Sequence, residues 1–515
     1  MSAQTRAWTI AFAIALLPLL ARLASAQVQA SNLLDAQIGN IPFTDPHDRT
    51  DVYDQFLLDV RVSTLRAGLR FESDHNSEDT YIYAKVTQRY ADWSDGPLRT
   101  RVGNFYTILG RGLVHRSFEL PGVVLDPAFL RSRYGLSRDV DGVLAEATSA
   151  HLSARAFSGT PNGGEFPPSG ASIGLDPYAG QLSGGQLVAT LARGVKIGAT
   201  AEKSSAAGTR DLHLGSGFVD FDPLRLFKSS VALPLYAEYA QGDQSFGDWW
   251  RFSTADTVPH ALYAGANLLW GPVALAAEWK HYRSFRLGTN DPPSLVREHS
   301  DVLLNRNTHV LNANREEGHQ LEGTFVSGAW GTLTANASRA EGRLGKKPAV
   351  FLEHFIELRT PADPARRFDA AAFFDEGQDE FVGVSERRTG GANATVRLWA
   401  GFSLTADLEH LRATRVRTSF DDHFLLIEAA RAAWGSLALV WERTTDPTQE
   451  TPSAALEPGI TPRNFVRVSV SGDVGSRSHV ALTIGEQRGG LGCTSGTCYQ
   501  VLSFKGAQLR VTTRL

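Results

Sequence analysis

The chain has 515 residues, with 55 acidic against 51 basic side chains and a formal net charge of −4. This mild acidity argues against nucleic acid as a partner. Beyond the first 26 residues no stretch is long and apolar enough for a transmembrane helix, which excludes a helical membrane protein. The 48 glycines, the 10% aromatic residues and the single methionine favour β-structure.

The N-terminus has the pattern of a secretory signal. Arg6 supplies positive charge before an apolar stretch over residues 7–21, and small residues at 24–26 form a cleavage pattern. The apolar run is shorter than the roughly 20 residues of a membrane anchor. We therefore expect residues 1–26 to be a cleaved signal peptide and residues 27–515 to form the mature protein.

Apolar and polar residues alternate with period two along nearly the whole mature chain. Over residues 402–409, Leu404 and Leu408 share one face, while Asp407 and Glu409 share the other. A helix would not produce this periodicity. The same design recurs over residues 65–72, 392–400 and 507–515. Counting such segments predicts about 22 strands, within a range of roughly 16 to 24.

The strand number decides which face points inward. A barrel of this size has a lumen too wide for side chains to fill, so the apolar face must meet lipid and the charged face must line water. The sequence thus predicts an all-β fold over residues 27–515, a single transmembrane antiparallel β-barrel of the outer membrane. The expected lumen-facing residues are Arg66, Arg70, Arg397, Asp407, Glu409, Arg467, Arg510 and Arg514. A soluble two-sheet sandwich is the alternative left open.

Tight turns and long connections alternate along the chain. Four tryptophans stand beside tight turns, where an interfacial aromatic girdle is expected: Trp270, Trp330, Trp399 and Trp434. The long polar connections cover residues 110–141, 158–184, 242–259, 286–318, 342–391 and 446–462. Residues 212–221 are assigned as a strand and residues 351–359 as part of a loop. Short periplasmic turns and long extracellular loops are the usual asymmetry of outer-membrane barrels.

The connection over residues 110–141 combines charge with unusual apolar content. Its apolar runs cover residues 120–125 and 127–130. One hypothesis is that this segment folds into the lumen and narrows it, and that its charges set an electric field across the passage. Those charges are Arg111, Arg116, Arg131 and Arg133 against Glu119 and Asp126. The alternative, equally open, is a loop that caps the outside of the barrel.

No catalytic motif stands out, so we expect no enzymatic activity and no cofactor. The acidic stretch over residues 375–380 could bind Ca²⁺ in a loop, but its spacing does not match an EF-hand, and no metal site is expected. Cys493 and Cys498 lie close together in a Gly-rich segment. In an oxidising compartment such a pair forms a small loop-closing disulfide.

The last strand, residues 508–515, resembles the C-terminal signature that outer-membrane proteins present to their assembly machinery, with Leu515 where Phe is usual. Two local motifs resemble a poorly characterised family of large, porin-like bacterial outer-membrane barrels. They are the run from Gly103 to Tyr106 leading into residues 110–113, and the Cys-x4-Cys loop followed by Phe504-x-Gly506. The resemblance implies architecture and location and carries no assigned reaction. Membrane lipid and the barrel-assembly machinery are the partners it implies.

The function predicted from these features is a porin-like channel for the passive passage of small polar solutes. The alternative is a non-conducting barrel that serves as a structural or surface-interaction platform.

Overall fold

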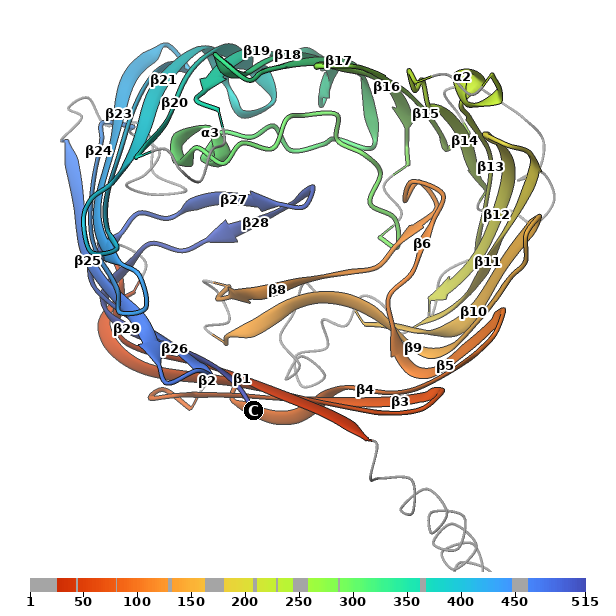
Figure 1. Cartoon of the computed structure of the whole chain (residues 1–515), viewed down its shortest axis with the longest axis horizontal. Coiled ribbons are helices and arrows are strands. Elements are labelled where there is room, and N and C mark those ends of the chain that lie inside the picture. The colour runs from red at the N-terminus through yellow and green to blue at the C-terminus, as the bar shows by residue number, and fades with distance from the viewer. Residues whose placement is uncertain are drawn as a thin grey trace, which may run out of the picture.

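Figure 1 shows a wide ring of strands that surrounds several inner segments. The structure is a computed structural model. It describes residues 26–42, 45–79, 81–127, 132–162, 180–206, 211–227, 230–243, 258–285, 288–361, 367–446 and 462–515. The expected signal peptide therefore lies almost wholly outside the described residues. Within the described ranges, no helix has the length and apolar character needed to cross a membrane.

The main sheet contains 25 strands in the described part, and 24 of them close into an antiparallel barrel. The first five are β1 (Gln27–Ile41), β2 (Asp45–Val62), β3 (Leu65–Asn76), β4 (Tyr83–Asp95) and β5 (Leu98–Phe105). The next eight are β9 (Tyr134–Thr148), β10 (Leu152–Asn162), β11 (Gly180–Ala192), β12 (Val195–Ala206), β13 (Leu212–Phe221), β14 (Leu235–Asp243), β15 (His260–Trp270) and β16 (Val273–Arg283). Then come β17 (Arg315–Ser327), β18 (Gly331–Leu344), β19 (Lys347–Arg359), β20 (Phe368–Asp379), β21 (Val384–Arg397), β22 (Phe402–Arg415), β23 (Thr418–Arg431) and β24 (Gly435–Thr444). The last three are β25 (Arg463–Val474), β26 (Ser478–Gln487) and β29 (Phe504–Arg514).

The barrel closes between its first and last strands. β1 pairs with β29 in antiparallel register, from Ser31 opposite Arg514 to Asn40 opposite Lys505. Each of the 24 described wall strands is thereby paired on both sides, which is what a membrane-spanning sheet requires. The predicted all-β antiparallel barrel is confirmed, with an even strand number slightly above the expected value of about 22.

One predicted connection is wrong. Residues 342–391, expected to be a single long loop, contain all of β19 and β20. Phe351 and Phe355 of β19 point into the lumen and are nearly inaccessible, while Ile356 and Leu358 are exposed on the outside. Both faces of the strand are apolar at these positions, so the period-two signal was lost. The acidic stretch over residues 375–380 consequently ends a strand and is not a loop, and Asp375 forms an ion pair with Arg387.

The outer surface of the barrel is apolar. Ile427, Leu439, Val468 and Ile484 face one another in register across β23 to β26, and each is at least 40% exposed. Leu65, Leu404, Leu408 and Leu509 are exposed in the same way on the faces that the sequence assigned to lipid. Apolar side chains in a continuous outward band are stable against lipid and unfavourable in water. The protein is therefore a transmembrane barrel.

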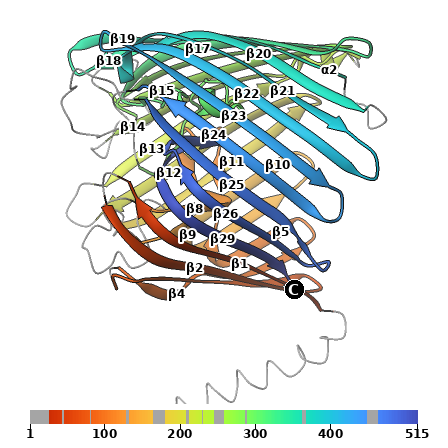
Figure 2. The ribbon, with the colours of Figure 1, turned by 90° about the vertical axis from the view of Figure 1, so that its left-hand side faces the viewer.

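The two ends of the barrel differ. β1 starts and β29 finishes at one end, here called the turn end, where most connections are short. The opposite loop end carries the longer connections (Figure 2). All four tryptophans of the expected girdle lie at the turn end, and their exposed fractions run from 64% at Trp270 to 81% at Trp330. The girdle itself stays a prediction.

Candidate functional site

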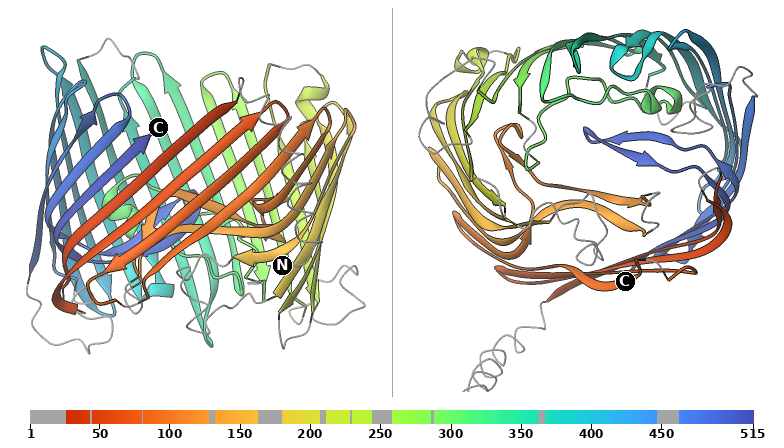
Figure 3. Two further views of the ribbon diagram at one scale, coloured as in Figure 1. Left: turned by 90° about the horizontal axis from the view of Figure 1, so that it is seen from below. Right: turned by 180° about the vertical axis from the view of Figure 1, so that it is seen from behind.

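Three connections of the loop end fold into the lumen (Figures 1 and 3). The first joins β5 to β9 and contains β6 (Ile108–Leu109), β7 (His115–Arg116) and β8 (Phe118–Leu125). The second joins β16 to β17 and contains the short helix α3 (Val302–Arg306). The third joins β26 to β29 as a hairpin of β27 (Gly490–Thr494) and β28 (Thr497–Val501). We call these the first, second and third inner segments.

Apolar contacts hold the first two inner segments against the barrel wall. Leu109, Leu113 and Val114 of the first segment are fully buried in a cluster with wall residues such as Phe157 and Tyr282. Leu303 of the second segment is fully buried in another cluster with residues of β22 to β24. Burying a leucine side chain contributes about 1.5–3 kcal/mol. The part of the first segment that packs on the inner wall thus precedes the apolar runs expected at residues 120–125 and 127–130, of which Leu120 is buried and residues 128–130 lie outside the described residues.

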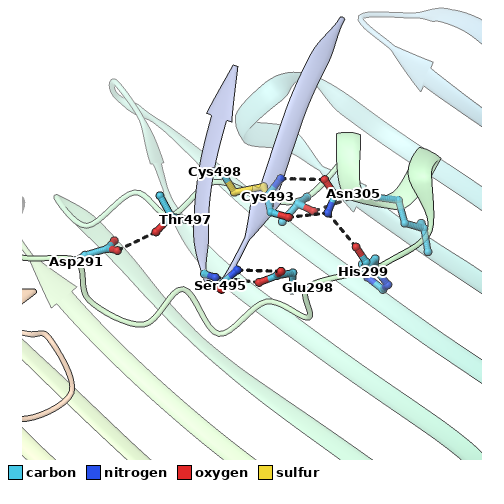
Figure 4. The surroundings of a disulfide bond; sticks show 11 residues. Asp291, Glu298, His299, Asn305, Cys493, Ser495, Thr497 and Cys498 are labelled. Atoms are coloured by element: carbon cyan, nitrogen blue, oxygen red, sulfur yellow. Dashed lines mark hydrogen bonds between the residues drawn. A yellow bond between two sulfur atoms is a disulfide. The ribbon is translucent and has the colours of Figure 1, made fainter. Parts of the chain in front are cut away.

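The three inner segments also bind one another near the disulfide, and Figure 4 shows its surroundings on the second and third segments. The Sγ atoms of Cys493 and Cys498 are bonded at 2.04 Å, directly across the hairpin. Both carboxylate oxygens of Glu298 accept backbone N–H groups of the hairpin tip, from Ser495 at 3.0 Å and Gly496 at 2.9 Å. Arg116 of the first segment donates to the Ser495 carbonyl at 2.7 Å. Hydrogen bonds thus join three stretches of chain that are distant in sequence.

Charged groups on the wall fix the second inner segment. Both carboxylate oxygens of Glu409 accept backbone N–H groups at the start of α3, from Val302 at 2.8 Å and Leu303 at 2.7 Å. At the other end of the helix, Arg306 forms an ion pair with the fully buried Glu442. A carboxylate at a helix N-terminus and a cation at its C-terminus both interact favourably with the helix dipole and stabilise the helix. The inner wall therefore positions the helix from both ends.

A buried charge cluster fixes the end of the first segment. Arg133 is 2% exposed and contacts Asp35 of β1 at 2.9 Å and Asp51 of β2 at 3.7 Å. Arg510 of β29 contacts the same Asp35 at 2.7 Å. Burial lowers the pKa of the Arg133 guanidinium, but Asp35 and Asp51 outweigh it and the pKa is raised. The cluster stabilises the seam where the barrel closes.

The residues expected at a constriction do not converge on one ring. Arg111 stacks on the Tyr236 ring at 4.9 Å, and Arg116 pairs with Asp291 at 2.7 Å. Glu119 pairs with Arg70 of the wall at 3.0 Å. Arg133 lies in the buried cluster, and Asp126 lies 3.9 Å from Arg49 beside it. Arg131 lies outside the described residues.

The residues expected to face the lumen lie on inner-facing positions of their strands. Arg66 pairs with Asp59 at 2.8 Å, Arg70 with Glu72 at 2.8 Å, and Arg467 with Glu442 at 2.9 Å. Glu409 accepts hydrogen bonds from the start of α3, and Arg510 forms an ion pair with Asp35. Asp407 shares the inner face of β22 with Glu409, and Arg514 that of β29 with Arg510. Arg397 lies near the turn end of β21 and is exposed.

Two cavities flank the third inner segment. One, of about 390 Å³, lies between the hairpin and the second segment and is lined by Asp291, Glu298 and Thr497 among others. The other, of about 440 Å³, lies between the hairpin and the wall at β1, β26 and β29. Burial raises the pKa of Asp291, although Arg116 and Arg138 act against it. The hairpin thus separates two polar spaces inside the barrel.

Sequence reasoning missed the second inner segment as a lumen element. It carries the same signal that marks the first, since Leu295, Leu303 and Leu304 are buried within a connection that the sequence predicts to be polar. It also missed Asp35 and Glu442, single acids on otherwise alternating strands. Among the described residues, no three or more His, Cys, Asp or Glu side chains come together to hold a metal ion.

No known family model matches the chain, and no curated protein matches it. Among solved structures, OccK5 (OpdH) of Pseudomonas aeruginosa is similar at 14% identity and a TM-score of 0.40, covering 72% of this chain and 96% of its own. The outer membrane protein opdK of Pseudomonas aeruginosa is similar at 10% identity and a TM-score of 0.40, covering 72% and 97%. OccK2 (OpdF) of the same organism, in complex with glucuronate, gives 10% identity and a TM-score of 0.38, covering 69% and 93%. Likeness at this level adds nothing to the barrel description above.

Proposed function

We propose that this protein is an outer-membrane channel that lets small polar solutes pass passively. The observation that carries the proposal is the lumen itself. In a barrel of 24 strands, the described parts of the inner segments leave polar cavities on both sides of the hairpin and do not fill the interior with an apolar core. Water-lined passages of this kind are what porin-type barrels use, whereas smaller barrels have interiors filled by side chains.

The location follows from the same architecture. Barrels with a lipid-facing apolar band occur in outer membranes, and export to that membrane requires a signal such as residues 1–26. The turn end, where both ends of the barrel sequence lie, then faces the periplasm. We also propose that β29 is the strand presented to the barrel-assembly machinery, and that the four turn-end tryptophans sit at the membrane interface.

We expect solutes to pass the junction where the three inner segments meet, and we place the constriction there. Arg116 faces Asp291 there, and Glu298 and the hairpin tip are adjacent. Opposite charges at a narrow point orient polar solutes and set ion selectivity. The proposed constriction thus differs from the expected one, in which arginines stood across from Glu119 and Asp126, and contains one ion pair, Arg116 with Asp291, at the junction of the three segments.

Single-channel recording in a planar bilayer tests the proposal. Purified, refolded protein should give steady steps of conductance, and Arg116→Ala should change the cation-to-anion permeability ratio. Arg514→Ala, at the turn end and away from the junction, is the matched control. Heat-modifiable migration on a gel identifies the correctly folded barrel. If this folded barrel never conducts, the channel proposal is wrong and the protein is a non-conducting platform. An unchanged permeability ratio in Arg116→Ala would show that the junction of the inner segments does not set ion selectivity.

A further inference from the structure

The cavity of about 440 Å³ lies over the part of the inner wall where three glycines align across neighbouring strands. Gly39, Gly506 and Gly485 pair in register across β1, β29 and β26, and all three have positive φ. A Cβ at each position would meet neighbouring backbone within 2.2 Å, so only glycine fits. No side chain projects from this row. The space beneath the third inner segment therefore stays open and falls within the range of small-molecule sites, about 300–1,000 Å³.

Uncharged polar side chains stand on both sides of the glycine row. Toward the turn end, Gln37, Gln508 and Thr483 face one another in register across the same three strands. Toward the loop end, Gln487 lines the same cavity. Within the described part of the chain, the amides of Gln37 and Gln487 have no hydrogen-bond partner in the protein. Each amide offers two donors and an acceptor, which suits solutes that both donate and accept.

The hairpin supplies the opposite wall with an aromatic ring. Tyr499 and Gln500 of β28 line the cavity, and Gln500 donates only a long bond of 3.4 Å to the Val501 carbonyl. Burial raises the pKa of the Tyr499 hydroxyl, which therefore stays protonated and able to donate. An aromatic face beside several amides can cover the apolar side of a ring whose hydroxyls bind at the edge.

The charges around this cavity are balanced. The lining contains Arg133 and Arg510, which share the fully buried Asp35, and Asp126, which lies beside Arg49. Arg49 is in turn paired with Asp51 at 2.8 Å. Counted together with Asp35, Arg49 and Asp51 behind the lining, three arginines are balanced by three aspartates, so the site has no net charge to offset the cost of desolvating an ion. A neutral solute pays a smaller desolvation free energy than an ion when it enters the cavity.

We propose that this cavity binds neutral, polyhydroxylated solutes, sugars of one or two rings being the matching class, on their way through the barrel. The inference rests on the proposed channel function for its physiological meaning, but not for the binding itself. The amides of Gln37 and Gln487 bind hydroxyl groups, and Tyr499 packs against the ring.

Current block in a planar bilayer tests the solute class. Maltose and glucose should reduce the single-channel current in a saturable way, and glucuronate should do so at least fivefold more weakly at equal concentration. In Gln37→Ala/Gln487→Ala the half-blocking concentration of maltose should rise at least fivefold. Thr395→Ala/Thr405→Ala, which removes an inner-wall hydroxyl pair at 2.9 Å on distant strands, should leave it unchanged. Block by glucuronate as strong as that by glucose would overturn the neutral class.

Binding measured without conductance separates the two proposals. Saturation-transfer NMR on the detergent-solubilised barrel should show maltose signals that disappear in the Gln37→Ala/Gln487→Ala variant. If the barrel binds maltose but does not conduct, the proposed channel function is wrong and the proposed binding site stands. If the channel conducts but maltose does not bind, the channel function stands and the proposed binding site is wrong. Equal maltose signals in the wild type and the double variant would also overturn it.

Discussion

Asn305 and Cys493 exchange two hydrogen bonds across 188 residues of chain. The side-chain amide of Asn305 donates to the Cys493 carbonyl at 2.9 Å, and the Cys493 N–H donates back to Asn305 Oδ1 at 2.9 Å. Asn305 lies in the helix that the wall holds through Glu409 and Glu442, and Cys493 lies near the tip of the hairpin that divides the lumen (Figure 4). This reciprocal pair fixes the hairpin to the second inner segment.

Asn305→Ala should loosen the hairpin without harming the barrel. Two lost hydrogen bonds contribute about 1–3 kcal/mol, which corresponds to a shift of about 5- to 150-fold toward an undocked hairpin. Single-channel traces should show new transitions between conductance levels. Asn307→Ala is the control, because the Asn307 amide donates only to Leu303 within the same helical segment. Traces of Asn305→Ala as quiet as those of the control would mean that the hairpin is fixed by other contacts.

Opening the disulfide should act on the same hairpin. In the chain-entropy description, closing so short a loop contributes about 2 kcal/mol. The paired substitution Cys493→Ser/Cys498→Ser should raise the hydrogen-exchange rate of β27 and β28. Exchange in β26 and β29, which pair with each other in the wall, should stay the same. Equal protection of the hairpin with and without the disulfide would show that Glu298 and Asn305 suffice.

Arg133→Met should destabilise the whole barrel. The arginine is buried among Asp35, Asp51 and Asp126, so its removal leaves buried carboxylates with less positive charge around them. Breaking such a buried pair typically costs about 3–5 kcal/mol. The temperature at which the gel mobility shifts to that of the unfolded protein should fall clearly. Arg514→Met, an exposed position of the same closing seam, should leave this temperature close to the wild-type value.

The sequence predicts the wall well, because lipid outside and water inside impose alternation on every strand. Leu404, Leu408 and Leu509 face lipid as the pattern required. The pattern fails at β19, where Phe351 and Phe355 face inward but are covered by His309 and His299 of the second inner segment. Whether an inner face meets water or an inserted segment is decided by tertiary packing, which alternation cannot express.

The site was less predictable for a related reason. Arg116 and Arg133 were selected for their charge, but their roles depend on partners far away in the sequence, at Asp291 and Asp35. The glycine row shows the same limit. Gly39, Gly485 and Gly506 become neighbours only once β1 closes on β29.

The ionic contacts between His309 of the second inner segment and the barrel wall should weaken as pH rises. His309 lies between Asp379 at 3.0 Å and Glu316 at 3.2 Å. Burial lowers the pKa of His309, but its hydrogen bonds to Asp379 and Glu316 outweigh burial, and the pKa is raised. A raised pKa means that the charged form is bound more tightly in the folded protein. The contribution is therefore fully present below the ordinary value of about 6.5 and is lost as pH rises through the higher folded value.

Hydrogen exchange of residues 302–314, corrected for intrinsic rates, measures this loss. Protection should fall as pH rises above about 6.5 and through the raised pKa of His309, and His309→Gln should be weakly protected at every pH. His479→Gln is the control, since that histidine pairs with Asp473 on the exposed turn end. A pH profile unchanged in His309→Gln would assign the effect to another group.

A charge placed on the outer face should destabilise the barrel, and one placed on the inner face should not. Leu408 is 58% exposed on the lipid side of β22, whereas Thr405 of the same strand faces inward and bonds Thr395 at 2.9 Å. An arginine on the lipid face costs about 2–4 kcal/mol near the middle of the membrane. Leu408→Arg should therefore lower the unfolding free energy in lipid vesicles by that amount. Thr405→Arg should change it by less than about 1 kcal/mol, because its side chain reaches water in the lumen. Equal losses in the two variants would mean that the outer face of β22 does not meet lipid.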